Sequence, residues 1–584
     1  MSNLMASFNA GVSGLQSAQA SITATAHNLA NAHTPGYTRQ QVIVTDSFYQ
    51  NTQGQHSNLM QVGTGTVIVK TRQIRNTFLD ARYRLEFGRQ GFYEINHKTV
   101  QELEDMLGEL EGESFLKGIT DMQEAFNSLT EDPSDVVHRD ELISMASLFV
   151  QRAQEVKKEL TAYQTSLNTE VLRQVNAIND LVADIREMNK LIQRYEATGE
   201  SANDYRDKRN QYLDELSYYI NFETNEEKDG TITIYSEGAF LLEPARQNFL
   251  GVEYQSQESQ LLVPIWENGG RYFRNESLAY SSKAQTDVGS LRGLMVARGN
   301  YAALYTDTPV KPEEEDYADP KDYQIAMNQY EDDVKQYNDS VGASVVMTVQ
   351  SQLDILVHGI VTMINDAFCP NKEMKLQDGT TIKVLDEENA LQGDDINNTV
   401  GAELFSRRGV ERYKEMTVTD ETGKTLTVKV YQEEDPSDVY SLYTIGQLVI
   451  NPVVLKDPST IGTMYHETSG QREGYATDAI RAIANSFHDN IGTLSPNSQT
   501  KYGALDYYRE MVGDLSVRGS VWNGIVANQE ETADSIDQER QNVMGVSSEE
   551  ELADLIKFQR CYDASSRYIT TVAEMLEYLI ERLG

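Results

Sequence analysis

The residues that could carry out chemistry stand apart from one another in this sequence. The segment 421–425 reads Glu-Thr-Gly-Lys-Thr and resembles the end of a phosphate-binding loop, in which backbone amides and a lysine hold the phosphates. That motif needs a glycine five residues before Gly423, and the chain has Val418 there. We therefore expect a hairpin turn at this position rather than a nucleotide site.

Residues that bind metals do not gather at the spacing of a known site either. His466 and Glu467 begin like the helix of a zinc protease, but Gly470 stands where the second histidine is required. The run 393–398 carries acidic and amide groups that could hold calcium, although its spacing does not match a full calcium loop. The sequence thus predicts no metal, no cofactor and no catalytic constellation. A carboxylate pair brought together only by folding would leave no such signal.

The charge of the chain restricts its partners. It has 584 residues, with 90 acidic and 50 basic side chains and a formal net charge of -40, so nucleic acid and anionic membranes would repel it. One segment concentrates basic residues without an interleaved aromatic platform, and we expect these residues to pair with carboxylates of neighbouring helices or subunits. They are Arg72, Arg75, Arg82, Arg84 and Arg89.

The length exceeds what one hydrophobic core supports and predicts roughly three or four domains. The two cysteines, Cys369 and Cys561, are too far apart in sequence to indicate a disulfide framework. No apolar run approaches the roughly 18 to 20 residues that span a bilayer, so we expect no membrane insertion. The first basic residue is Arg39, which argues against a cleaved secretory signal. The protein should stay in the cytoplasm or leave by a route that cleaves no leader.

The elements that would position any site are organised by the two ends of the chain. Apolar or small residues recur there every seven positions, which is typical of coiled-coil helices. Neither stripe can bury itself, so we expect the termini to pack on each other or on neighbouring subunits. At the N-terminus the two series are Leu4, Gly11, Ala18, Thr25 and Phe8, Leu15, Ile22, Leu29. At the C-terminus they are Leu555, Tyr562, Ile569, Leu576, Leu583 and Leu552, Gln559, Ser566, Ala573, Ile580.

Between the ends, the pattern alternates between helices and β-hairpins. Short strands at 41–45 and 66–70 predict a β-rich elbow, and an apolar period of helical type continues from 74 to about 219. Glycine turns at 229–230, 378–379 and 422–423 predict hairpins. We further expect helices at 288–304, 341–368, 475–494 and 503–544, and a last helix capped by Ser547 or Ser548.

These patterns predict a multidomain α+β protein with coiled-coil-like terminal helices and a long helical bundle with inserted β-rich outer domains. The segment 309–339 is an acidic insertion, which should be solvated, with some helix in its C-terminal half. The expected domains are 1–70 (terminal helix and β elbow), 71–222 (helical bundle), 223–285 (β-rich outer domain, first part), 286–369 (helical segment with the insertion 309–339), 370–472 (β-rich outer domain, second part), 473–544 (return of the bundle) and 545–584 (C-terminal helix).

Four stretches resemble the flagellar rod, hook and hook-associated axial proteins. Residues 26–40 read AHNLANAHTPGYTRQ and are similar to the N-terminal signature of that family, except that His33 stands where asparagine is usual. Its Gly-Tyr-Thr-Arg-Gln ending resembles the hook-associated branch, since hook and rod proteins more usually have Gly-Phe. Residues 11–15, 202–216 and 545–583 are similar to further segments of the family.

The resemblance implies a structural protein, not an enzyme, that is secreted through the flagellar type III export apparatus with an export chaperone. Copies of the chain would assemble through their terminal helices and join the flagellar hook protein to the next hook-associated protein at the hook-filament junction. Two alternatives stay open: a hook or distal rod subunit, and a secreted hydrolase carried on flagellar termini.

The resemblance also implies roles for individual residues. Asn28, Asn31 and Thr34 would end the first helix and orient the elbow, Gly36 would permit the turn, and Tyr37 would pack against it. The candidate assembly seam consists of Leu4, Phe8, Leu15, Ile22, Leu29, Leu552, Leu555, Tyr562, Ile569, Leu576 and Leu583.

Overall fold

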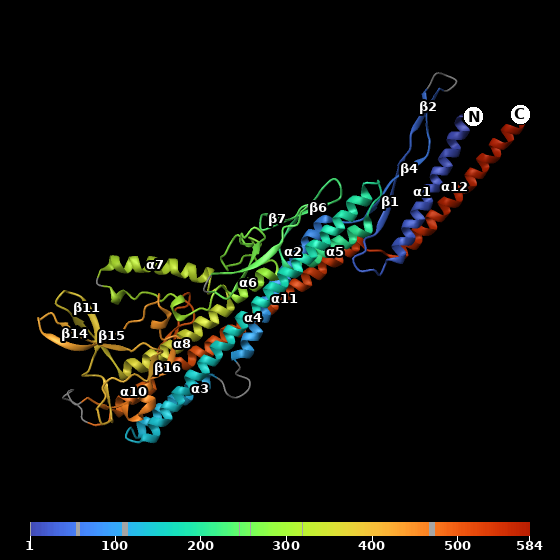
Figure 1. Cartoon of the computed structure of the whole chain (residues 1–584). Coiled ribbons are helices and arrows are strands. Elements are labelled where there is room, and N and C mark those ends of the chain that lie inside the picture. Colours follow the sequence, from blue (N-terminus) through green and yellow to red (C-terminus); the bar gives the residue numbers. More distant parts are fainter. Residues whose placement is uncertain are drawn as a thin grey trace.

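The computed structural model describes residues 2–53, 59–107, 115–244, 246–256, 259–317, 319–466 and 474–583. The molecule is elongated along a shaft of long helices, and both chain termini lie at the same end of it (Figure 1). A four-stranded sheet occupies the region of the opposite end. The predicted α+β organisation is therefore confirmed.

The terminal helices run side by side, as the matching seven-residue repeats predicted (Figure 1). They are α1 (Ser2–Ala30) and α12 (Ser548–Leu583). The predicted elbow is a long antiparallel ribbon that packs on α1 and is built from β1 (Gln40–Asp46), β2 (Tyr49–Gln53), β3 (Leu59–Gly63) and β4 (Thr66–Gln73). The hydroxyl of Ser547 accepts a hydrogen bond from the Glu550 amide at 3.4 Å, so the expected serine cap of α12 is present.

The shaft consists of helices that pack along their lengths. The longest has 61 residues and extends about 90 Å at 1.5 Å per residue. It begins where the Asp135 carboxylate accepts a hydrogen bond from the Val137 amide at 2.8 Å. The shaft helices are α2 (Thr77–Leu107), α3 (Phe115–Glu131), α4 (Val136–Glu196), α5 (Asn203–Tyr219) and α11 (Ala504–Met544).

The first β-rich module lies against the middle of α4. Its hairpins and one buried helix share a hydrophobic core with α4 and α5. Helix formation was predicted for 288–304, but the helix is shorter, because Gly289 and Gly299 at its ends adopt φ of +93° and +76°. The elements are β5 (Glu223–Glu226), β6 (Ile232–Ser236), β7 (Ala239–Leu242), β8 (Leu250–Tyr254), β9 (Leu262–Trp266) and α6 (Ser290–Arg298).

The second β-rich module lies toward the far end of the shaft. Its largest sheet has the strand order β10-β11-β15-β14, and its other strands form two-stranded pairs. The strands are β10 (Asn371–Lys375), β11 (Thr381–Leu385), β12 (Leu391–Gly393), β13 (Phe405–Arg407), β14 (Tyr413–Thr419), β15 (Thr425–Tyr431), β16 (Leu448–Ile450) and β17 (Gly462–Tyr465). A short helix, α9 (Pro452–Lys456), follows β16.

The acidic insertion forms a helix in its C-terminal half, as expected. This helix, α7 (Pro320–Asp339), is largely exposed and is attached to the body by buried Tyr337 and by the Tyr330 hydroxyl, which donates to the Pro496 carbonyl at 2.8 Å. The helix expected at 475–494 is shorter than predicted. It is α10 (Thr477–Ser486), and a small hairpin of β18 (Gly492–Thr493) and β19 (Lys501–Tyr502) follows it.

One helix, α8 (Val345–Phe368), is long and apolar enough to cross a membrane by length and composition. The expectation that no segment of the chain reaches this length and hydropathy was therefore wrong. Most of its side chains are buried in the largest hydrophobic core, among residues of α2, α3, α4, α10 and α11. This is the environment of a core helix.

Candidate assembly site

Helices α1 and α12 approach closely where α1 carries glycine. A Cβ atom added at Gly11 would lie 2.8 Å from Cγ1 of Ile569, and one at Gly14 would lie 3.1 Å from Oγ of Ser565. Real Cβ atoms essentially never approach another atom within 3.0 Å, so Gly11 must stay small for the two helices to pack in this way, and a Cβ at Gly14 would require the Ser565 side chain to shift.

The buried side of α1 is the series that begins at Leu4. Gly11, Ala18 and Thr25 are buried, and Leu4 itself is half-buried. The other predicted series is also half-buried: Phe8, Leu15, Ile22 and Leu29. Both series of α1 therefore lie within the packed surface of the terminal pair and its ribbon.

On α12 only one of the two predicted series lies in the packed surface. Leu555, Tyr562, Ile569 and Leu576 are half-buried, whereas Leu552 is exposed and the side chain of Leu583 falls outside the described residues. The second packed line is 551, 558, 565 and 572, in which Glu551 and Val572 are buried. This line precedes the predicted one by a single residue, which rotates the seam by about 100° around the helix.

Apolar side chains of α12 outside the packed stripe stay exposed within the described part of the chain. Leu552 is 47 % exposed, Ile556 53 % and Ile580 66 %, and Met575 and Leu579 are exposed elsewhere around the helix. Apolar side chains that do not pack within the chain can be buried only against another molecule.

The start of α12 is joined to the end of α1 by a fully hydrogen-bonded asparagine. Asn28 is 1 % exposed. Its Nδ2 donates to the Gln40 carbonyl at 2.9 Å and to Oε2 of Glu551 at 3.0 Å. Its Oδ1 accepts from the Tyr37 hydroxyl at 2.8 Å and from the Gln40 amide at 2.9 Å. The Asn28 side chain thus connects α1, the elbow and α12. We call this set of contacts the Asn28 hub.

The turn after α1 is held by local hydrogen bonds. Nδ2 of Asn31 donates to the His27 carbonyl at 3.0 Å, and the Thr34 hydroxyl donates to Oδ1 of Asn31 at 3.2 Å. The Tyr37 amide donates to the Thr34 carbonyl at 3.2 Å. Burial raises the pKa of the Tyr37 hydroxyl, and the carboxylates of Asp204, Asp207 and Glu551 raise it further, so this hydroxyl stays a proton donor.

Arg39 supplies the ionic part of the same contact. Its Nε lies 2.6 Å from Oε1 of Glu551, and its terminal nitrogens lie 3.4 Å from Glu550 and 3.5 Å from Asp554. Its amide donates to the Met544 carbonyl at the end of α11 at 2.8 Å. Glu551 is 2 % exposed, so Arg39 neutralises a carboxylate that burial would otherwise make costly.

The elbow is fixed to the shaft by α5. Nε2 of Gln211 donates to the Pro35 carbonyl, and Gly36, at φ +74°, leaves room for this side chain. The Thr38 amide donates to Oδ2 of Asp207 at 3.1 Å. Burial raises the pKa of Asp207 to about 6.

Further contacts reach the ribbon strands. Nε2 of Gln73 donates to Oδ1 of Asp207 at 2.7 Å, and Nδ2 of Asn203 donates to Oε1 of Gln40 at 3.2 Å. Gln40 in turn donates to Asp204 at 3.1 Å. The sequence motifs at 26–40, 202–216 and 545–583 thus meet in one place. Sequence reasoning quoted these motifs, yet it did not single out Arg39, Gln40, Asp207 or Glu551 as contacts.

Three arginines of the basic segment, Arg75, Arg84 and Arg89, pair with carboxylates inside the chain, whereas Arg72 donates to Gln41. Arg75 binds Asp80 at 2.5 Å, and Arg84 binds Asp214 at 2.7 Å. Buried Arg540 of α11 reaches both carboxylates, Asp80 at 3.0 Å and Asp214 at 2.7 Å. This network connects α2, α5 and α11 directly below the hub.

The segments that partly match phosphate-binding or metal-binding motifs have structural explanations. The phosphate-loop-like segment is the turn between β14 and β15, where Gly423 has φ of +85° and the Asp420 carboxylate accepts from the Thr422 and Lys424 amides. In the calcium-like run, Asp395 accepts from the Thr399 amide at 2.7 Å. Glu467 and Gly470 lie outside the described residues, and within the part that the structure describes no group of three or more His, Cys, Asp and Glu could hold a metal ion.

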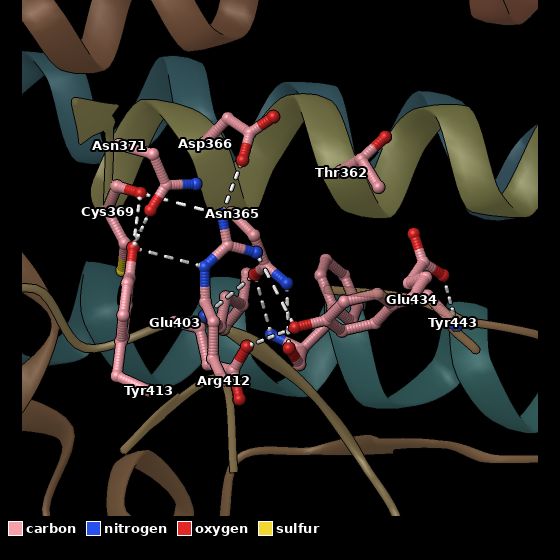
Figure 2. A network of polar contacts seen from close by, with 12 residues as sticks. Thr362, Asn365, Asp366, Cys369, Asn371, Glu403, Arg412, Tyr413, Glu434 and Tyr443 are labelled. Atoms are coloured by element: carbon pink, nitrogen blue, oxygen red, sulfur yellow. Dashed lines mark hydrogen bonds and ion pairs between the residues drawn. The ribbon is translucent and has the colours of Figure 1, made fainter. Parts of the chain in front are cut away.

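A second polar network lies in the far module (Figure 2). The buried Glu403 carboxylate accepts from the Tyr443 hydroxyl at 2.7 Å and the Ser406 hydroxyl at 2.6 Å. Arg412 pairs with Asp366, and its Nε lies 3.4 Å from the Tyr413 hydroxyl. Burial raises the pKa of Glu403. Because Glu403 is enclosed and bonded on both oxygens, this network fastens the β strands to α8 rather than facing a substrate.

Comparison with known proteins gives consistent matches. The family model described as flagellar hook-associated protein FlgK helical domain matches residues 100–367. Models of the flagellar basal body rod FlgEFG protein C-terminal region and of the flagella basal body rod protein match 537–582 and 8–38.

Relatives extend the match to nearly the whole chain. Flagellar hook-associated protein 1 of Bacillus subtilis is 23 % identical over 98 % of this chain and 96 % of its own length. The protein of the same name from Escherichia coli K12 is 20 % identical over 98 % of each chain. The solved flagellar hook junction protein FlgK from Burkholderia pseudomallei is 11 % identical, with a TM-score of 0.48, over 80 % of this chain and 100 % of that one.

Proposed function

The chain belongs to the flagellar hook-associated protein 1 family, and from this premise we propose that it is a structural subunit joining hook to filament in the bacterial flagellum. In this role its copies pack around a common axis. They contact the hook protein on one side and the next hook-associated protein on the other.

The observation that carries the proposal is the set of exposed apolar side chains on α12. Within one chain α12 packs on α1 and leaves Leu552, Met575 and Ile580 to solvent. Side-by-side subunits remove that surface from water at a gain of about 25 cal/mol per Å² of apolar area. The predicted seam residues of α1 and α12 stay the candidates for this interface, with Leu552 and Ile580 facing the neighbouring subunit.

The contacts around the Asn28 hub hold the terminal pair at a defined angle to the shaft. Thr38 and Gln73 bind Asp207 of α5, and the Arg39 amide binds the Met544 carbonyl at the end of α11. A junction between two different polymers needs such a defined angle. The division of the chain into seven segments, which form fewer domains, stays a proposal.

Export completes the proposed role. The chain is secreted through the flagellar type III apparatus with the help of an export chaperone and has no enzymatic activity. The hydrolase alternative requires two carboxylates facing a cleft. Assays of the purified protein on peptidoglycan and on denatured protein test this alternative directly.

Immunogold labelling of intact flagella tests the location. Antibody against residues 223–470, which include the outer modules, should place gold only at the joint between hook and filament. Label along the whole hook would identify a hook subunit instead. An unlabelled axial structure would reject both assignments.

A further inference from the structure

A cavity of about 320 Å³ lies in the first β-rich module, beside α6 and the hairpin of β8 and β9. Its size is that of a small-molecule site. One wall is apolar and is formed by Val263, Pro264, Leu278 and Met295. The other groups on its surface include Gln255, Arg271, Phe273, Asn275, Glu276 and Arg292.

The cavity contains a buried cation. Arg292 is 6 % exposed and donates to the carbonyls of Asn275 at 3.2 Å and Ser277 at 2.5 Å. Its guanidinium lies 5.0 Å from the centre of the Phe273 ring. Among the residues that the structure describes, no carboxylate forms an ion pair with it. Burial lowers the pKa of Arg292, and the Glu237 carboxylate, which is not in ion-pair contact, offsets this effect only in part. A buried cation without a direct carboxylate partner is costly, and a bound anion would reduce that cost.

Two further groups point to a polar ligand. Arg271 stands at the rim, 36 % exposed, with its nearest carboxylate, Glu276, 3.9 Å away and 77 % exposed. Oε1 of Gln255 is buried and has no hydrogen-bond partner within the described part of the chain. Because amide oxygen and nitrogen exchange places by a simple flip, Gln255 can offer either a donor or an acceptor to a ligand.

We propose that this cavity binds a small organic carboxylate, with its charged end at Arg292 and Arg271 and its apolar body against Val263, Pro264, Leu278 and Met295. A planar guanidinium pairs well with a carboxylate, and the apolar wall explains why a bare inorganic anion would fill the space poorly. The site lies away from the terminal helices and does not depend on the proposed role in the junction.

The test uses the full chain labelled with ¹³C at the methionine methyl groups, with the Met295 resonance identified from a Met295→Leu variant. Phenylacetate should shift this resonance saturably. Phenylacetamide, which has the same shape without the charge, should not shift it. Inorganic phosphate should bind at least tenfold more weakly than phenylacetate, measured at the same resonance.

Charge variants give the sign of the effect. Arg271→Gln should weaken phenylacetate binding about two- to fivefold, and Glu276→Gln should tighten it by a similar factor, because both groups are at a solvated rim. Arg292→Gln should weaken it about tenfold or more. Arg246→Gln, which removes an arginine of the same module that contacts Phe240 and does not line the cavity, is the matched control and should leave binding unchanged.

The two rim variants keep the test decisive if Arg292→Gln fails to fold. No saturable shift with phenylacetate would overturn the proposal. Equal shifts with phenylacetamide, or rim variants that act in the same direction, would overturn the assignment of the arginines. Phosphate binding as tight as that of phenylacetate would reject the apolar part of the site.

Discussion

Replacing Asn28 with alanine should loosen the connection between the terminal helices and the shaft. The side chain makes four hydrogen bonds, to Tyr37, Glu551 and both backbone groups of Gln40, and is 1 % exposed. Alanine removes all four and leaves the buried Glu551 carboxylate with one donor fewer. Part of this cost is recovered because Gln40 is only half-buried and water can reach it.

The expected loss is about 2 to 3 kcal/mol of local stability, the range for one or two buried polar groups left without partners. Amide hydrogen exchange measures it at the Gln40 amide and over the first turns of α12. A loss of this size accelerates exchange about 30- to 150-fold at these amides. Exchange in the core of α8 should not change, since no residue of the hub lies there.

Two variants serve as controls. Asn31→Ala removes only exposed side-chain bonds, to His27 and from the Thr34 hydroxyl, so it should accelerate exchange less than about fivefold. Asn28→Asp keeps the acceptor but places a carboxylate against Glu551, and it should be at least as damaging as alanine at neutral pH. If Asn28→Ala exchanges like the parent chain, or if Asn31→Ala is equally damaging, the hub does not fix the angle.

Four further predictions follow from the same contacts. Leu15→Asp and Leu576→Asp should leave a folded middle but prevent incorporation into flagella, and normal incorporation of both would refute the seam. Gly11→Val should separate α1 from α12 and lower the helical content of the isolated chain, measured by circular dichroism, because its Cβ would lie 2.8 Å from Ile569. Arg540→Gln should cost about 1 to 3 kcal/mol in denaturant unfolding, since buried Asp80 and half-buried Asp214 each lose one cation and keep another, Arg75 and Arg84. The Asp207 carboxyl group should titrate near pH 6 rather than near 3.8, because the folded state binds this proton more tightly than the unfolded state. The stability of the elbow should therefore fall as pH rises from about 4 to 6. Asp207→Asn should abolish this pH dependence.

Much of the architecture follows from local signals. The seven-residue repeats predicted α1 and α12, and the glycine turns predicted hairpins at Gly230, Gly379 and Gly423, all of which have positive φ. Boundaries were less accurate. The helices at 290–298 and 477–486 are shorter than their apolar patterns, because glycines and a small hairpin end them earlier.

The candidate site could be predicted only in part. Repeats identified Leu555, Tyr562, Ile569 and Leu576 on the packed side of α12, but the second line expected there, from Leu552 to Ile580, faces solvent apart from the half-buried Ser566. A repeat shows that a stripe exists, yet the rotation of the helix against its partner depends on where glycine allows close contact. The partners of Asn28 were not predictable in this way, since Glu551 is 523 positions away in the chain.

Sequence patterns alone indicate an acidic α+β chain with coiled-coil ends, hairpin modules and motifs that resemble those of the flagellar axial proteins. These features are local, because periodicity, turn residues and caps act over a few positions. The tertiary structure shows which apolar side chains of α12 stay exposed, how three distant motifs meet at Asn28, and that buried Arg292 has no ion-pair partner among the described residues. Those features depend on contacts between residues far apart in sequence, whose geometry is set by the packing of the whole chain.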